Sequence, residues 1–174
     1  MPKAYSLTEV IPVYKYGETI ESKIDSKNVY DINKNLSIDE NYSFNYYGIP
    51  KKKSEPEYVN NQKVYPRDRI VSEHALIHAE FKCEIDSSHP SFIRKTNGTN
   101  YTEPHHLIPM SQQDKFCVSL DVEENVVSLC SNCHNQIHYG KGFEELVSEL
   151  FNQRKEHLKK VGIDIELEEL LKMY

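Results

Sequence analysis

Hydrophobic residues recur with a helical period in two segments of the chain. In the first segment, residues 67–81, they form a stripe that predicts an amphipathic helix. In the second, which begins at Phe143, the spacing predicts a longer helix that ends near Gly162. A shorter apolar and acidic stretch over about 166–173 predicts one more helix. The apolar stripe of the second segment consists of Phe143, Leu146, Val147, Leu150, Phe151 and Leu158.

Turn signals and short apolar runs predict strands between these helices. Asn97-Gly98 is a hairpin signal between residues 92–94 and 101–103. Residues 126–129 form a short strand that precedes a helix beginning near Ser131. Two further edge-type strands are predicted near the N-terminus, at residues 10–14 and 42–46.

The distribution of these elements predicts two parts. Residues 48–66 contain three prolines and a lysine run, which is typical of a linker. Residues 1–64 are therefore interpreted as a β-rich extension whose role the sequence does not reveal, with DNA recognition as one hypothesis. Residues 65–174 form the second part. We expect an α+β fold with a small ββα-metal core and a zinc knuckle, flanked by helices.

The composition limits the classes of protein that fit. Of the 174 residues 38% are hydrophobic, below the ~45–50% usual for soluble domains, so a bound metal would help to hold the fold. No apolar run approaches the about 20 residues of a membrane span. The N-terminus lacks the features of a secretory signal, so we expect a cytoplasmic protein with reduced cysteines. The net charge of −6 argues against a non-specific nucleic-acid binder, but not against a nuclease, because bound cations reverse the local field.

Metal-binding side chains are concentrated in one stretch of the chain. All four cysteines and five of the eight histidines lie within residues 83–138. In a reducing compartment a Cys-x-x-Cys pair indicates a metal site before it indicates a disulfide. This stretch therefore predicts bound metal.

The first candidate site combines Cys83 and His89 with the pair Cys130 and Cys133. Tetrahedral zinc in structural sites takes four nitrogen and sulfur ligands, and three cysteines with one histidine are a standard set. Cys117 competes with His89 for the fourth place. We favour His89, because Cys117 is flanked by apolar residues and resembles a small buried hydrophobic residue.

The second candidate site contains His105, His106, Asn125, His134 and His138. His134 and His138 are spaced i, i+4, so that both rings project from one face of the predicted helix. His105 and His106 end a predicted strand, in which consecutive side chains point to opposite sides. One of these two histidines can therefore bind a metal with the helix pair, while the other is free to act as a base.

Three separated motifs resemble the HNH, or ββα-metal, endonuclease superfamily. The zinc-knuckle opening and the C-terminal tail are similar to those of bacterial methylation-dependent restriction nucleases. The resemblance covers roughly residues 65–174 and says nothing about residues 1–64. The motifs are residues 101–109 (YTEPHHLIP), 124–138 (ENVVSLCSNCHNQIH) and 83–92 (CEIDSSHPSF).

This resemblance implies a role for each residue of the second site. His105 and His134 correspond to metal ligands, and His138 to the further ligand found in the nuclease colicins. His106 corresponds to the general base. Asn125 corresponds to the asparagine that orients the strand and its loop.

The implied reaction is metal-dependent hydrolysis of DNA phosphodiester bonds, in a restriction or defence role. Mg²⁺, Mn²⁺, Ni²⁺ and Zn²⁺ remain open as the catalytic ion beside a structural Zn²⁺. Expected partners are DNA and, as an option, a second copy of the chain in a homodimer; no membrane is expected. The basic residues expected to contact phosphates are Arg94, Lys141, Arg154 and Lys155.

Two alternatives are weighed against a nuclease. A catalytically silent, zinc-dependent DNA-binding module accounts for the cysteine site, but it does not account for the histidines of the second site. A metalloprotease with a His-x-x-x-His site requires Glu directly after the first histidine. Asn135 occupies that position, so this class is rejected.

Overall fold

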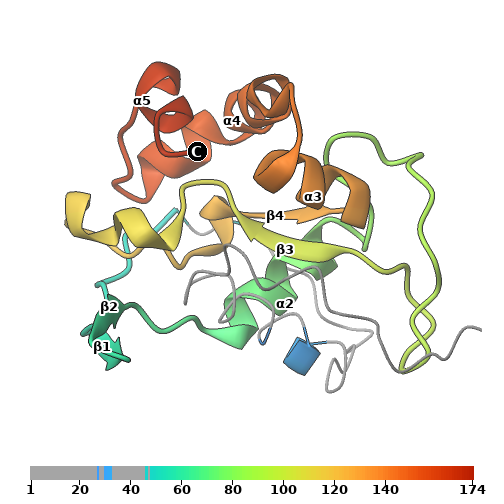
Figure 1. Cartoon of the computed structure of the whole chain (residues 1–174), viewed down its shortest axis with the longest axis horizontal. Helices are drawn as coiled ribbons and strands as arrows, with labels where there is room; N and C mark the ends of the chain where they lie inside the picture. The colour runs from blue at the N-terminus through green and yellow to red at the C-terminus, as the bar shows by residue number, and fades with distance from the viewer. Residues whose placement is uncertain (1–26, 28–29, 33–45, 47) are drawn as a thin grey trace, which may run out of the picture.

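A two-stranded antiparallel ribbon lies at the centre of the structure (Figure 1). The computed structural model describes residues 27, 30–32, 46 and 48–174. Strands β3 (Glu103–His106) and β4 (Val126–Leu129) pair with His105 opposite Val127. Because successive side chains on a strand point to opposite faces, His105 and His106 face opposite sides of the ribbon.

Helix α2 (Arg69–His78) packs against one face of this ribbon (Figure 1). Asp68 caps its N-terminus by accepting a hydrogen bond from the backbone N–H of Ile70 at 3.0 Å. The helix ends earlier than the sequence predicts. Glu80 and Phe81 adopt left-handed backbone conformations, with φ of 53° and 56°, which cannot continue an α-helix.

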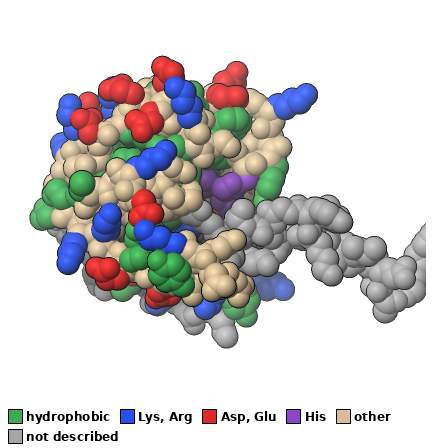
Figure 2. All heavy atoms as spheres, turned by 60° about the vertical axis from the view of Figure 1, so that its left-hand side comes forward, with side chains coloured by type: hydrophobic (Ala, Val, Ile, Leu, Met, Phe, Trp, Pro, Cys, Tyr) green, Lys and Arg blue, Asp and Glu red, His purple; other side chains and the backbone are tan. Residues whose placement is uncertain are grey.

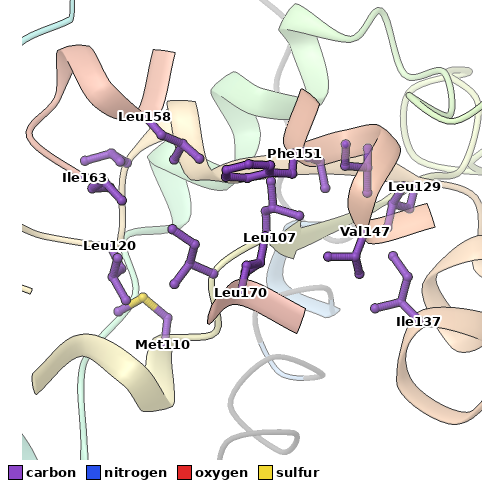
Figure 3. Packing of buried hydrophobic residues seen from close by; sticks show 14 of the residues in the cluster. Leu107, Met110, Leu120, Leu129, Ile137, Val147, Phe151, Leu158, Ile163 and Leu170 are labelled. Atoms are coloured by element: carbon purple, nitrogen blue, oxygen red, sulfur yellow. The ribbon is translucent and has the colours of Figure 1, made fainter. Parts of the chain in front are cut away.

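Three helices cover the other side of the ribbon: α3 (Ser131–Tyr139), α4 (Phe143–Lys160) and α5 (Leu167–Leu171) (Figure 1). Gly162 follows α4 with φ of 79°, as expected for a glycine that ends a helix. The main core lies between these helices and the ribbon, and burial of each large apolar side chain contributes roughly 1.5–3 kcal/mol. Figure 3 shows its members Leu107, Met110, Leu120, Leu129, Ile137, Val147, Phe151, Leu158, Ile163 and Leu170.

A small hairpin packs beside this core. Asp114 ties the hairpin to the segment after β3, because its carboxylate accepts hydrogen bonds from Lys63 Nζ at 2.6 Å and from the Tyr65 hydroxyl at 2.5 Å. The hairpin consists of strands β1 (Glu57–Val59) and β2 (Gln62–Val64). Asp114 lies in the short 3₁₀ helix η2 (Met110–Lys115), and a second 3₁₀ helix, η3 (Glu123–Asn125), precedes β4.

The predicted α+β class and the ββα arrangement of β3, β4 and α3 are confirmed. The hairpin predicted around Asn97-Gly98 forms only in part. Gly98 adopts φ of 74° in the turn, but a single bridge joins Ile93 to Asn100. Residues 103–106 pair with β4 instead, because that pairing buries both strands against helices.

Other expectations about the N-terminal part stay predictions. The strand predicted at 10–14 and most of that at 42–46 lie outside the described residues, and the division at residue 64 is untested. Within the described part of the chain, no helix combines the length and apolar character needed to cross a membrane.

Candidate functional site

The first candidate site brings together the three thiols and the imidazole that the sequence predicts. The ligand atoms of Cys83, His89, Cys130 and Cys133 all lie within 4.8 Å of one another. Nδ1 of His89 is 3.4 Å from Sγ of Cys133 and 3.7 Å from Sγ of Cys130. Tetrahedral zinc takes this donor set in closed structural sites, so the group is compatible with a structural zinc that joins the loop after α2 to the start of α3.

The surroundings of these thiols favour a metal ligand at Cys83. Burial alone would raise the pKa of the Cys83 thiol, but hydrogen bonds from the backbone of Cys130 and Asp86 lower it to about 7. The thiolate, which is the form that binds metal, is therefore well populated near neutral pH. Cys117 is exposed and outside the group, so the choice of His89 as fourth ligand fits, whereas the expectation of a buried Cys117 is wrong.

An ion pair fixes the cysteine site to helix α4. The carboxylate of Glu84, next to Cys83, pairs with the guanidinium of Arg154 and accepts from the backbone N–H of Ser128 at 2.6 Å. Burial raises the pKa of Glu84 to about 7 and lowers that of Arg154 to about 10, as expected for two charges removed from water. Arg154 is 3% exposed, so its role is structural and the expectation that it contacts DNA is corrected.

The second candidate site is a group of three histidines from β3 and α3. The ligand atoms of His105, His134 and His138 lie within 4.8 Å of one another. The His105 ring centroid is 5.3 Å from that of His134 and 5.0 Å from that of His138. Burial, and then proximity to His134 and His138, lowers the pKa of His105 well below its usual value, which keeps the ring in the neutral form that binds cations.

This group is open on one side. His105 is buried, His134 is half-buried and His138 is exposed, so a ligand can approach past His138. Figure 2 shows histidine side chains in a hollow of one face of the molecule. Three imidazoles with an open side are a donor set that suits a divalent transition metal, and such sites leave positions for water or substrate.

Two of the three rings are also held by a hydrogen-bond partner outside the group. The carboxylate of Glu103 lies 2.5 Å from Nδ1 of His134 and accepts a hydrogen bond from the Ser131 hydroxyl at 2.9 Å. Burial would raise the pKa of Glu103, but these contacts hold it below its usual value. The ionised carboxylate accepts a hydrogen bond from Nδ1–H, so Nε2 of His134 is the nitrogen left to bind a cation. Nε2 of His105 lies 3.0 Å from the hydroxyl of Tyr174.

His106 is separated from the three-histidine group, as the strand alternation predicts, but it is not without a partner. Its Nε2 lies 3.0 Å from the carboxylate of Asp121, and the two side chains are 9% and 7% exposed. Asp121 also accepts from the backbone N–H of Asp68 at 2.6 Å. Burial would raise the pKa of Asp121, but these hydrogen bonds hold it below its usual value. His106 thus lies outside the metal-binding group, as the sequence predicts, and a carboxylate that the sequence did not predict holds its ring.

Asn125 holds the backbone that follows the two histidines. Its side chain accepts from the N–H of Ile108 at 2.8 Å and donates to the carbonyls of Ile108 at 3.0 Å and Leu120 at 2.9 Å. Its own carbonyl accepts from the N–H of Leu107 at 2.8 Å. With no exposed surface, the side chain acts as a fixed brace for the end of β3.

Comparison with known proteins identifies this arrangement. Residues 92–140 match the family model described as HNH endonuclease. By this match, residues 92–140 are similar to an HNH endonuclease domain (hereafter the HNH domain). The match contains β3, β4 and α3, and hence both histidine groups, so the resemblance stated from the sequence is confirmed.

The chain is similar in sequence to a curated restriction enzyme, and the solved structure of a restriction endonuclease aligns with it. The Type IV methyl-directed restriction enzyme EcoKMcrA of Escherichia coli (strain K12) is 37% identical over 90 residues, which cover 52% of this chain and 30% of the relative. The solved structure of the Type IV phosphorothioation-dependent restriction endonuclease ScoMcrA aligns with a TM-score of 0.45 and 19% identity, over 90% of this chain and 26% of that chain. The chain thus spans less than a third of either protein. Neither comparison supports the optional homodimer.

The basic residues expected to bind DNA around the HNH domain differ in burial. Arg94 is 4% exposed, and its guanidinium donates to the Thr99 hydroxyl at 3.1 Å and to the Thr102 carbonyl at 2.5 Å. Arg94 therefore holds the 92–102 loop together. The expectation that it contacts DNA is corrected. Lys141 and Lys155 are exposed and stay candidates.

Sequence reasoning missed three residues beside the histidines of the HNH domain. Glu103 had a detectable signal, because it precedes His105 by two positions and so lies on the same face of β3. Asp121 lies in a loop, and Tyr174 lies beyond α5. Neither position carries a periodic or spacing signal that points to the histidines.

Proposed function

We propose that this chain is a metal-dependent DNA endonuclease with a role in restriction. The observation that carries the proposal is the division of labour at β3. His105 joins the open three-histidine group on one face, while the adjacent His106 is held by Asp121 on the other. A structural metal site does not require the second, carboxylate-held histidine.

The three-histidine group would hold the catalytic cation. His105, His134 and His138 supply three neutral imidazole nitrogens, and a divalent cation bound there neutralises the charge that develops on a phosphodiester during hydrolysis. The exposed side of the group, at His138, is where the phosphate would enter. Glu103 holds His134 so that the ring presents one nitrogen to this site.

His106 would accept the proton of the attacking water. Its Nε2–H donates to Asp121, so Nδ1 carries the lone pair that takes a proton. The ionised Asp121 stabilises the imidazolium that forms in this step. Asn125 keeps the end of β3 in place and thereby fixes the distance between His106 and the three-histidine group.

DNA is the proposed substrate because residues 92–140 match the HNH endonuclease family and the relative EcoKMcrA is a restriction enzyme. The formal net charge of −6 and the mixture of basic and acidic side chains on the face in Figure 2 argue against a broad electrostatic surface. Phosphate contacts would then be few and local, with Lys141 and Lys155 as the candidates. The cysteine site would bind structural zinc and hold α3 in register with β3.

Cleavage of supercoiled plasmid tests the proposal. The zinc-loaded wild-type chain is incubated with Mn²⁺ and either methylated or unmethylated plasmid, beside His106→Ala and the control His78→Ala, whose histidine is exposed on α2 and outside both metal groups. We expect nicked or linear DNA from the wild type and the control, and a loss of about 10²–10⁴-fold with His106→Ala. Inert wild-type protein that still binds DNA across several metals would favour the silent DNA-binding module instead.

A further inference from the structure

The hydroxyl of Tyr174 lies between a backbone carbonyl and a histidine of the proposed cation site. It is 2.7 Å from the carbonyl oxygen of Leu107 and 3.0 Å from Nε2 of His105. A carbonyl oxygen can only accept a hydrogen bond, so the single hydroxyl proton of Tyr174 is donated to Leu107. Towards His105 the tyrosine oxygen can then only accept.

This assignment fixes the tautomer of His105. For Tyr174 to accept a hydrogen bond, Nε2 of His105 must carry the proton, and Nδ1 must carry the lone pair. A neutral imidazole binds a cation through its unprotonated nitrogen, so Nδ1 is the nitrogen available to the three-histidine group. The arrangement at His134 is the reverse, since Glu103 engages Nδ1 and leaves Nε2.

The position of Tyr174 is itself fixed by the fold. The buried Leu170 of α5 packs into the main core, and the Tyr174 ring lies 5.8 Å from that of Phe143, measured between centroids. Leu107, which accepts from Tyr174, donates its own N–H to the carbonyl of Asn125. Tyr174 and Asn125 therefore hold the two sides of one residue, immediately after the two histidines.

We propose that Tyr174 is a positioning residue for the cation site, and that it holds His105 with Nδ1 directed to His134 and His138. The site is thus completed by a segment beyond α5, outside residues 92–140 that match the HNH family. This inference rests on the proposed function, because it assumes that the three histidines bind a divalent cation. Tyr174 does not touch the cation or the DNA in this account.

The test measures Mn²⁺ binding by calorimetry on the full, zinc-loaded chain. Tyr174→Phe keeps the aromatic ring and removes only the hydroxyl. Tyr139→Phe is the matched control, because the Tyr139 ring lies 5.9 Å from the ligand His138 but is 80% exposed. We expect Tyr174→Phe to weaken Mn²⁺ binding by at least about tenfold, as is usual when the partner of a metal-binding histidine is removed. We expect Tyr139→Phe to match the wild type, and all three proteins to keep their zinc.

A second readout does not depend on Mn²⁺ binding. Nitrogen-15 NMR of the histidine rings in the zinc-loaded, Mn²⁺-free wild type should show His105 as the Nε2–H tautomer, and Tyr174→Phe should show a mixture. An Nδ1–H tautomer in the wild type overturns the inference, as does Mn²⁺ binding by Tyr174→Phe that is within twofold of wild type or tighter. If the wild type binds Mn²⁺ and Tyr174→Phe binds it equally well, this inference alone is refuted. Wild-type protein that takes up no cation beyond zinc refutes the proposed function as well.

Discussion

The carboxylate of Asp121 lies 3.0 Å from Nε2 of His106, and both side chains are almost excluded from water. In this environment the pair holds the ring in one orientation and one tautomer. The contact also reaches the N-terminus of α2, because Asp121 accepts from the backbone N–H of Asp68. The proposed base is therefore held by the helix that covers its face of the ribbon.

Asp121→Asn should slow DNA cleavage more than it weakens DNA or Mn²⁺ binding. The amide can donate a hydrogen bond to Nε2 of His106, which would place the ring proton on Nδ1 and remove the acceptor. We expect a loss approaching the about 10²–10⁴-fold that a general base contributes, measured as a single-turnover rate on plasmid. Asp114→Asn is the control, since its carboxylate is bonded to Lys63 and Tyr65, away from His106. Equal rates for both variants would remove Asp121 from the mechanism.

Loss of zinc should unfold the part of the chain that the cysteine site holds together. Binding of a structural zinc is coupled to folding, so a chelator should lower the melting temperature markedly. Cys133→Ser should lose the single zinc per chain found by elemental analysis and melt at a lower temperature. The exposed Cys117 gives the matched control, and Cys117→Ser should change neither quantity. A melting temperature that is indifferent to chelation counts against the site.

Arg154→Met should destabilise the protein, whereas Lys155→Met should not. Arg154 is buried against Glu84, and removal of one partner of a buried ion pair costs about 3–5 kcal/mol. Lys155 lies 3.7 Å from Glu166 on the surface, where such pairs contribute about 0–1 kcal/mol. Urea unfolding of the zinc-loaded proteins measures the difference. Similar stability of the two variants would contradict the structural role assigned to Arg154.

Lys141→Ala and Lys155→Ala should weaken DNA binding without a change in sequence or methylation preference. Each lysine that neutralises one phosphate contributes about 0.9 to the slope of log K against log salt concentration. We expect the slope to fall by about that amount for each variant in a fluorescence anisotropy titration. Lys82→Ala, whose lysine pairs with Glu80, should keep the wild-type slope. If neither lysine changes the slope, the DNA-binding face lies elsewhere.

The sequence predicted those parts of the site that depend on local geometry. The i, i+4 spacing of His134 and His138 and the alternation of His105 and His106 follow from the periods of helix and strand alone. The strand at 126–129 and the helix after it carried the same kind of signal. From these short-range rules the sequence analysis predicted that the three histidines belong to one site.

The sequence could not predict contacts that depend on burial or on distant segments. Arg94 and Arg154 have the charge of DNA-binding residues, and only the fold shows that carbonyls and a carboxylate surround them. Asp121 lies in a loop and Tyr174 lies beyond α5. Neither segment has a helical or strand periodicity from which its contact with the histidines could be predicted. The turn predicted at Asn97-Gly98 forms, but its flanking strands do not. Residues 103–106 pair with β4 instead, so tertiary pairing outweighed the local turn signal.

The cleavage rate of His134→Ala, measured on protein with the wild-type zinc content, decides whether the three-histidine group holds the catalytic cation. We expect this variant to bind one Mn²⁺ fewer than the wild type, to keep its zinc and to cut plasmid at least about 10³-fold more slowly. A variant that has lost that Mn²⁺ but still cuts at the wild-type rate would contradict the claim that the three-histidine group holds the catalytic cation.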